Sequence, residues 1–195
     1  SAVVGGTSYT PAASATSGGV VAFTIDAASA LVCSIASGIV TFQAVGTCKV
    51  LGNQAGNTNW NAATQNFQTF TVGKGAQVVS FTSTAPTSAV VDGSTYTATA
   101  TGGAGTEAVS FTIDSTTTDI CSIAAGVVSF LKAGTCKVNA NQAADTNYNA
   151  ASQVQQVITV GKGAQIVSFT STAPSNAVVD GSTYTATAIG GAGTA

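Results

Sequence analysis

The sequence predicts an all-β protein built of tandem antiparallel β-sandwiches. Residues 73–106 return almost unchanged at 161–194, and the offset of 88 residues is the size of a small domain rather than of a solenoid repeat. Within one repeat, turn signals separate short strand-like runs about every eight to twelve residues. No window shows sustained helical periodicity, so we expect strands throughout.

The two copies of the repeated stretch differ at four of 34 positions. The substituted pairs are Val78/Ile166, Thr87/Ser175, Ser88/Asn176 and Thr101/Ile189. In this register we expect a first repeat at 1–73 that lacks its opening strand, a complete repeat at 74–161, and the opening strands of a third repeat at 162–195.

The complete repeat contains seven expected strands. They span 77–83, 95–101, 109–113, 121–123, 127–131, 135–142 and 153–160. In strand 135–142, Cys136, Val138 and Ala140 share one face. Seven short strands in one repeat favour an immunoglobulin-like antiparallel sandwich, and a small barrel is the alternative.

The four cysteines, Cys33, Cys48, Cys121 and Cys136, give one pair in each repeat, with 14 residues between its members. The chain has no histidine. An even number of cysteines, paired by repeat, favours disulfides within each repeat over a zinc site. Disulfides place the protein outside a reducing cytosol.

The charged residues are few and scattered. Five lysines, no arginine and a net charge of −2 leave no basic patch, so we expect no nucleic-acid partner. No apolar run approaches the roughly 20 residues of a membrane span, and we expect none in this chain. Neither a signal peptide nor an anchor motif is visible, so we expect a fragment or a processed form.

Composition also argues against catalysis and against a metal site. No histidine is present to activate a serine, and we expect no enzyme and no cofactor. Asp114 and Asp119 flank a polar loop, but the first repeat keeps only Asp26 of this pair. Calcium requires about six to eight oxygen ligands, so a solvated loop is favoured and no metal is expected.

Two features leave a binding function open. Trp60 and Tyr148 each stand between asparagines in the last loop of their repeats, where the ring could stack on a sugar or plug the end of the sandwich. Because this feature recurs in both repeats, the plug is favoured. Threonines stand at every second position from Thr95 to Thr101 and form a regular hydroxyl row, as ice-binding surfaces have, but threonine also suits any exposed strand face. The first repeat breaks this row, which favours the plain strand.

Three segments resemble a known family. CSIAAGVVSFLKAGTCKV, the NANQAADTNYNAA that follows it, and the junction VGKGAQ are similar to bacterial immunoglobulin-like repeats of long secreted surface proteins and adhesins. The resemblance implies an extracellular location on a bacterial cell surface and a role in stalks, with ligand recognition often in separate terminal domains. We therefore expect a structural module of a stalk or filament, and the alternative is a carbohydrate-binding or ice-binding adhesin module.

The shifted register raises the question of partners. Either the chain is a window from a longer repetitive protein, or its third repeat completes the first repeat of another copy and forms a head-to-tail polymer. The strand that would be exchanged comprises Gln165, Ile166, Val167, Ser168 and Phe169. The expected partners are thus neighbouring repeats or copies of itself, with surface glycans as a further candidate.

Overall fold

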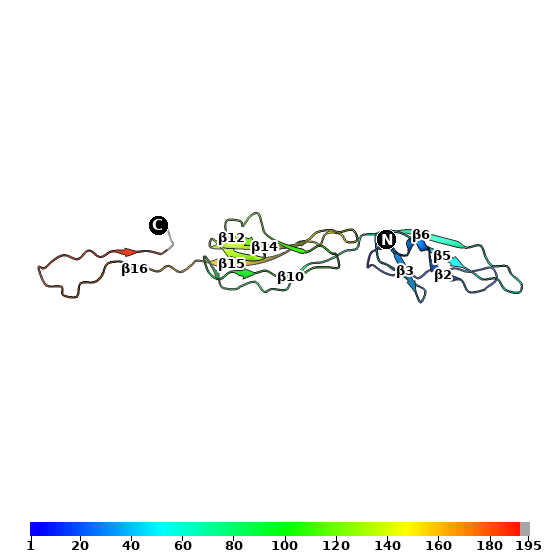
Figure 1. The fold of residues 1–195 in the computed structure, drawn as a ribbon, viewed down its shortest axis with the longest axis horizontal. Helices are drawn as coiled ribbons and strands as arrows, with labels where there is room; N and C mark the ends of the chain where they lie inside the picture. The colour runs from blue at the N-terminus through cyan, green and yellow to red at the C-terminus, as the bar shows by residue number, and fades with distance from the viewer. Residues whose placement is uncertain (192–195) are drawn as a thin grey trace.

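The computed structural model describes residues 1–191 and shows two β-sandwich domains followed by an extended hairpin. The domains lie end to end, and the hairpin continues beyond the second domain (Figure 1). The last four residues of the expected third repeat, 192–195, lie outside the described residues. No helix among residues 1–191 is long and apolar enough to cross a membrane.

The first domain is a sandwich of a four-stranded and a two-stranded sheet. Its elements are β1 (Ala2–Val3), β2 (Ala22–Ile25), the 3-10 turn η1 (Ala27–Ser29), β3 (Cys33–Ala36), β4 (Ile39–Phe42), β5 (Gly46–Asn53) and β6 (Asn66–Gly73). The larger sheet has the order β1-β6-β5-β2, with β1 parallel to β6, and β3 pairs with β4.

The second domain repeats this plan and adds strands to it. Its elements are β7 (Ser80–Phe81), β8 (Ala89–Val90), β9 (Tyr96–Thr97), β10 (Ala100–Thr101), β11 (Val109–Ile113), β12 (Cys121–Ala124), β13 (Val127–Phe130), β14 (Gly134–Gln142) and β15 (Val154–Gly161). The sheets have the orders β11-β14-β15-β8, β12-β13-β9 and β10-β7. The hairpin beyond it pairs β16 (Ser168–Phe169) with β17 (Ala188–Ile189).

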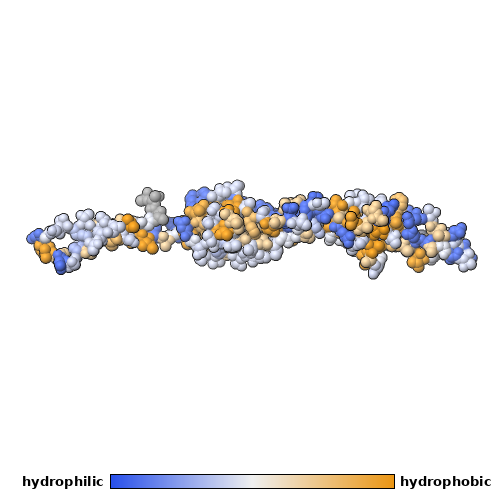
Figure 2. Space-filling view, viewed as in Figure 1, coloured by the Kyte–Doolittle hydropathy of each residue, from blue (hydrophilic) through white to orange (hydrophobic). Residues whose placement is uncertain are grey.

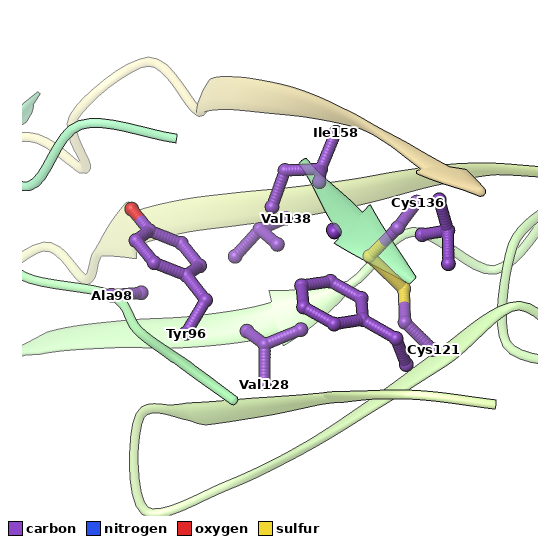
Figure 3. Close-up of a cluster of buried hydrophobic side chains, with 10 residues drawn as sticks. Tyr96, Ala98, Cys121, Val128, Cys136, Val138 and Ile158 are labelled. Atoms are coloured by element: carbon purple, nitrogen blue, oxygen red, sulfur yellow. A yellow bond between two sulfur atoms is a disulfide. The ribbon is translucent and has the colours of Figure 1, made fainter. Parts of the chain in front are cut away.

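Alternation along the long strands places one face in each core. In β14, Cys136, Val138 and Ala140 are fully buried, as their period of two predicts. Figure 3 shows Val138 beside Ile158 of β15, with Tyr96 and Val128 facing them from the opposite side of the core.

The tight hairpins depend on positive backbone angles. Ala125 and Gly126, which join β12 to β13, have φ values of 48° and 80°, and Ser37 and Gly38 have 49° and 79° between β3 and β4. Two consecutive positive φ angles define the turn that matches the twist of a two-residue hairpin, and glycine adopts the second without strain.

The expected single strand 95–101 is wrong, because it divides between two sheets. β9 pairs with β13, whereas β10 pairs with β7. Between them the Ser83 hydroxyl accepts a hydrogen bond from the amide of Thr99, at 2.8 Å. The Ser83 side chain therefore takes the place of a backbone acceptor at the point where the chain passes from one sheet to the other. The expected strand 77–83 is likewise reduced to β7 and an isolated bridge at Val78.

Candidate functional site: the domain junction and the open groove

The disulfides connect the two sheets of each sandwich. Cys33 of β3 is bonded to Cys48 of β5, and Cys121 of β12 is bonded to Cys136 of β14. All four sulfur-bearing residues are at most 1 % exposed. These are the pairs that the sequence predicts within each repeat, and such bonds are typical of proteins outside a reducing cytosol.

The loop that carries Tyr148 is shaped by Asp145. One carboxylate oxygen of Asp145 accepts from the amides of Asn147 and Tyr148, at 2.8 and 2.7 Å, and the other accepts from the amide of Thr106, at 2.8 Å. These amide donors, first those of Thr106 and Tyr148, lower the pKa of Asp145 to about 2. The carboxylate is therefore ionised at neutral pH, where it can accept all three amide hydrogen bonds.

This loop presents Tyr148 to the first domain. The ring packs against the apolar cluster of that domain, which includes Val4 and Val72. The expectation that the ring plugs its own sandwich is therefore wrong, because it covers the end of the preceding one. The amide of Val45 in the first domain also donates to Oδ1 of Asn147 across the junction, at 3.0 Å.

Gly75 is the residue that allows this close approach. A Cβ atom at this position would overlap the backbone oxygen of Val4 and lie 2.9 Å from Cε1 of Tyr148. The backbone of Gly75 pairs with the Tyr148 loop, because its amide donates to Asn147 O at 2.8 Å and its oxygen accepts from the Asn149 amide at 2.9 Å. The linker is thus part of the second domain rather than a free tether.

Trp60 stands at the same position of the first repeat but has no such neighbour among the described residues. Oδ1 of Asn57 accepts from the amides of Asn59 and Trp60, at 2.9 and 3.0 Å, and so forms the turn that Asp145 forms in the second domain. Trp60 is 50 % exposed. The structure therefore does not bring the two candidate rings together, since one lies at the junction and the other at the far end of the first domain.

One side of the first domain carries three neighbouring hollows, which together form an open groove. Their volumes are about 630, 120 and 410 Å³. The first two hollows share Gln68, and the second and third share Asn66. The groove runs from Tyr9 and Phe70 at one end to Trp60 at the other.

The acidic residues Asp114 and Asp119 are engaged by nearby side chains of the second domain. The hydroxyl and amide of Thr116 donate to Asp114 and lower its pKa, and Asp119 forms an ion pair with Lys132 at 3.0 Å. Within residues 1–191, no group of three or more cysteine, aspartate or glutamate side chains could hold a metal ion.

Sequence reasoning missed two residues that organise these sites. Asp145 shapes the junction loop. The sequence could have indicated this role, because Asn57 and Asp145 stand at equivalent positions, three residues before the aromatic residue of each loop. Gln77 is 8 % exposed and bonds three loop backbones, and its inward place in the alternation of the opening strand could have indicated its burial.

Comparisons with known proteins assign no function to this chain. No protein-family model and no curated protein matches the chain. Among solved structures, it is similar to the crystal structure of human mucin-like protocadherin EC1-2, with 10 % identity over 73 % of this chain and 85 % of that chain, at a TM-score of 0.31.

Proposed function

We propose that this chain is a non-catalytic, extracellular structural module that extends a stalk or filament on a bacterial surface. The observation that carries the proposal is the junction, where Tyr148 seals the apolar end of the preceding domain. A ring packed on a neighbouring core resists bending more than a free linker does. Repeats joined in this way add length in one direction, which is what a stalk requires.

The proposal also draws on composition and on the disulfides. A small domain has little core of its own, so a cross-link between its sheets supports it where no cytosolic reductant acts. Among the few charged side chains, Lys49 forms an ion pair with Asp26, and Lys132 forms one with Asp119. This pattern suits a spacer better than a site that must bind and transform a substrate.

The test uses Tyr148→Ala and its matched control, Trp60→Ala. We expect the whole monomeric chain to scatter X-rays as an elongated rod, and Tyr148→Ala to broaden the distance distribution and shorten its mean length. Trp60→Ala removes an aromatic ring from the equivalent loop but touches no domain junction, so it should leave the monomer's scattering unchanged. A compact wild-type particle, or equal profiles for the wild type and Tyr148→Ala, would contradict the stalk proposal.

A second candidate function is carbohydrate binding, and the exposed Trp60 favours it. The ring borders a hollow of about 410 Å³ together with Asn61 and Gln54, and aromatic faces beside amides suit sugar rings. Specific glycan binding that is lost in Trp60→Ala and kept in Tyr148→Ala would support it. A glycan array without specific signals removes this candidate.

A further inference from the structure

The open groove of the first domain has a counterpart in the second domain that is already filled. Residues that line each hollow have equivalents in the second domain, 87 or 88 positions later in the sequence. There, these equivalents contact the opening strand of the repeat, residues 75–86. That strand alternates strictly, with Gln77, Val79, Phe81, Ser83 and Ala85 turned toward the domain and the residues between them exposed. The second domain thus shows what fills the groove.

The contacts of the opening strand match the hollows one by one. Gln77 donates to the backbone oxygen of Asn149, at 2.8 Å, and the equivalent Asn61 borders the hollow of about 410 Å³. The ring of Phe81 lies 5.9 Å from that of Phe111, and the equivalent Phe23 borders the hollow of about 120 Å³.

The third contact is the most specific. The Ser83 hydroxyl and the Tyr96 hydroxyl lie 2.5 Å apart, and Nε2 of Gln156 donates to Ser83 O at 2.7 Å. In the first domain the equivalent Tyr9 already donates to Oε1 of Gln68, at 2.5 Å, beside the hollow of about 630 Å³. The tyrosine–glutamine pair that receives Ser83 in the second domain is therefore already formed in the first domain, beside a hollow that Ser1 and Thr7 also border.

The chain carries a second strand of this kind, and it is unpacked. Residues 165–173 repeat residues 77–85 except for Ile166, which replaces the outward-facing Val78. Val167 is 72 % exposed and Phe169 is 76 % exposed, whereas the equivalent Val79 is only 2 % exposed. Figure 2 shows apolar surface along this terminal segment. The strand is paired along one edge with β17, and the amides of Thr170 and Ser171 donate to Thr187 O. Its apolar side chains nevertheless remain exposed, and such a strand readily pairs with another chain.

The first domain of the same molecule is out of reach of this strand, because the second domain lies between them (Figure 1). We propose that residues 165–173 of a second copy of this chain fill the open groove and join copies head to tail. Gln165, Val167, Phe169 and Ser171 take the places that Gln77, Val79, Phe81 and Ser83 hold in the second domain. The contact uses a different surface on each copy, so it propagates into an open filament.

The exchange also gives Trp60 a partner. Gly163 lies close to the backbone oxygen of Val91, just as Gly75 lies close to that of the equivalent Val4. The third repeat therefore leaves the second domain along the same path as the second repeat leaves the first. A copy seated on that strand brings its Trp60 to Val91, as Tyr148 meets Val4. Residues beyond 176 are equivalent to the start of the chain. In the receiving copy, Ala2 and Val3 already occupy that place beside β6, so the exchanged strand ends near Ala173.

The test compares Val167→Glu with Ile166→Glu in the full chain, by light scattering over a concentration series and by electron microscopy. Both side chains are exposed in the single molecule, so neither substitution disturbs a domain. The wild type should grow into filaments as its concentration rises, and Val167→Glu should raise the concentration for assembly by at least about tenfold, because a glutamate would be buried without a partner. Ile166→Glu should assemble like the wild type.

Two outcomes would overturn the proposal: a wild type that stays monomeric at every concentration, or equal losses of assembly in both variants, which would indicate a merely sticky tail. The filament proposal rests on the stalk proposal, but each has its own test, so one can be refuted without the other. The rod shape and the effect of Tyr148→Ala are measured on the monomeric Val167→Glu chain, whereas assembly is read from the particle mass. Trp60→Ala should weaken assembly while leaving the monomer's shape unchanged.

Discussion

Removing the disulfide of the second domain should destabilise that domain strongly. The bond joins β12 to β14 and so connects the two sheets of the sandwich across a sequence separation of 15 residues. Closing a loop of this length removes chain entropy from the unfolded state worth about 3 kcal/mol. The double variant Cys121→Ala/Cys136→Ala should therefore lower the free energy of unfolding by about 3 kcal/mol.

Such a loss is large for a domain of this size. A domain of about 60–100 residues loses about 4–8 °C in melting temperature for each kcal/mol, so the expected drop is about 12–24 °C. Differential scanning calorimetry of the full chain without reductant measures it. Cys33→Ala/Cys48→Ala is the matched variant, because its bond spans the same separation of 15 residues and should lower the first domain's transition by a similar amount.

The comparison tests whether each bond acts within its own domain. Each double variant should shift one calorimetric transition and leave the other within about 4 °C, because a loss of about 0.5 kcal/mol or less is typical of distant changes. A loss below about 1 kcal/mol, or a shift of both transitions by either variant, would refute the reasoning from loop closure.

Two further predictions concern the second domain. Ile158→Ala empties a position that is 1 % exposed and should cost about 2–5 kcal/mol in chemical denaturation, whereas Val157→Ala, at a position 56 % exposed, should change stability by about 0.5 kcal/mol or less; equal effects would contradict the core assignment. The pKa of Asp145 is about 2 in the folded protein, below its ordinary value of 3.8, so its contribution to stability is present above about pH 4 and disappears as the pH falls toward 2. Asp145→Asn should therefore be less stable than the wild type at pH 7, and the difference should shrink in melts between pH 5 and pH 2; a constant difference would exclude this role for the carboxylate.

The sequence by itself determined the strand pattern and the cysteine pairing. Alternation of buried and exposed residues has a period of two, so the inward faces of 135–142 and 153–160 are visible in the residues themselves. One cysteine pair in each repeat leaves one pairing that keeps both bonds within domains. The turn at Ala125 and Gly126 is likewise a local property, since it depends on backbone angles of two consecutive residues.

Only the tertiary structure decided where the equivalent segments lie. Trp60 and Tyr148 occupy the same position of the repeat, yet Tyr148 packs on a neighbouring domain and Trp60 is half exposed, because a contact between domains depends on what lies beside each of them. The strands at 77–85 and 165–173 are nearly identical in sequence, but within the described residues only the first packs on a domain, since Val79 is 2 % exposed and Val167 is 72 % exposed. The division of 95–101 between two sheets also came from tertiary structure, because the Ser83 hydroxyl that takes the ladder's place is distant in sequence.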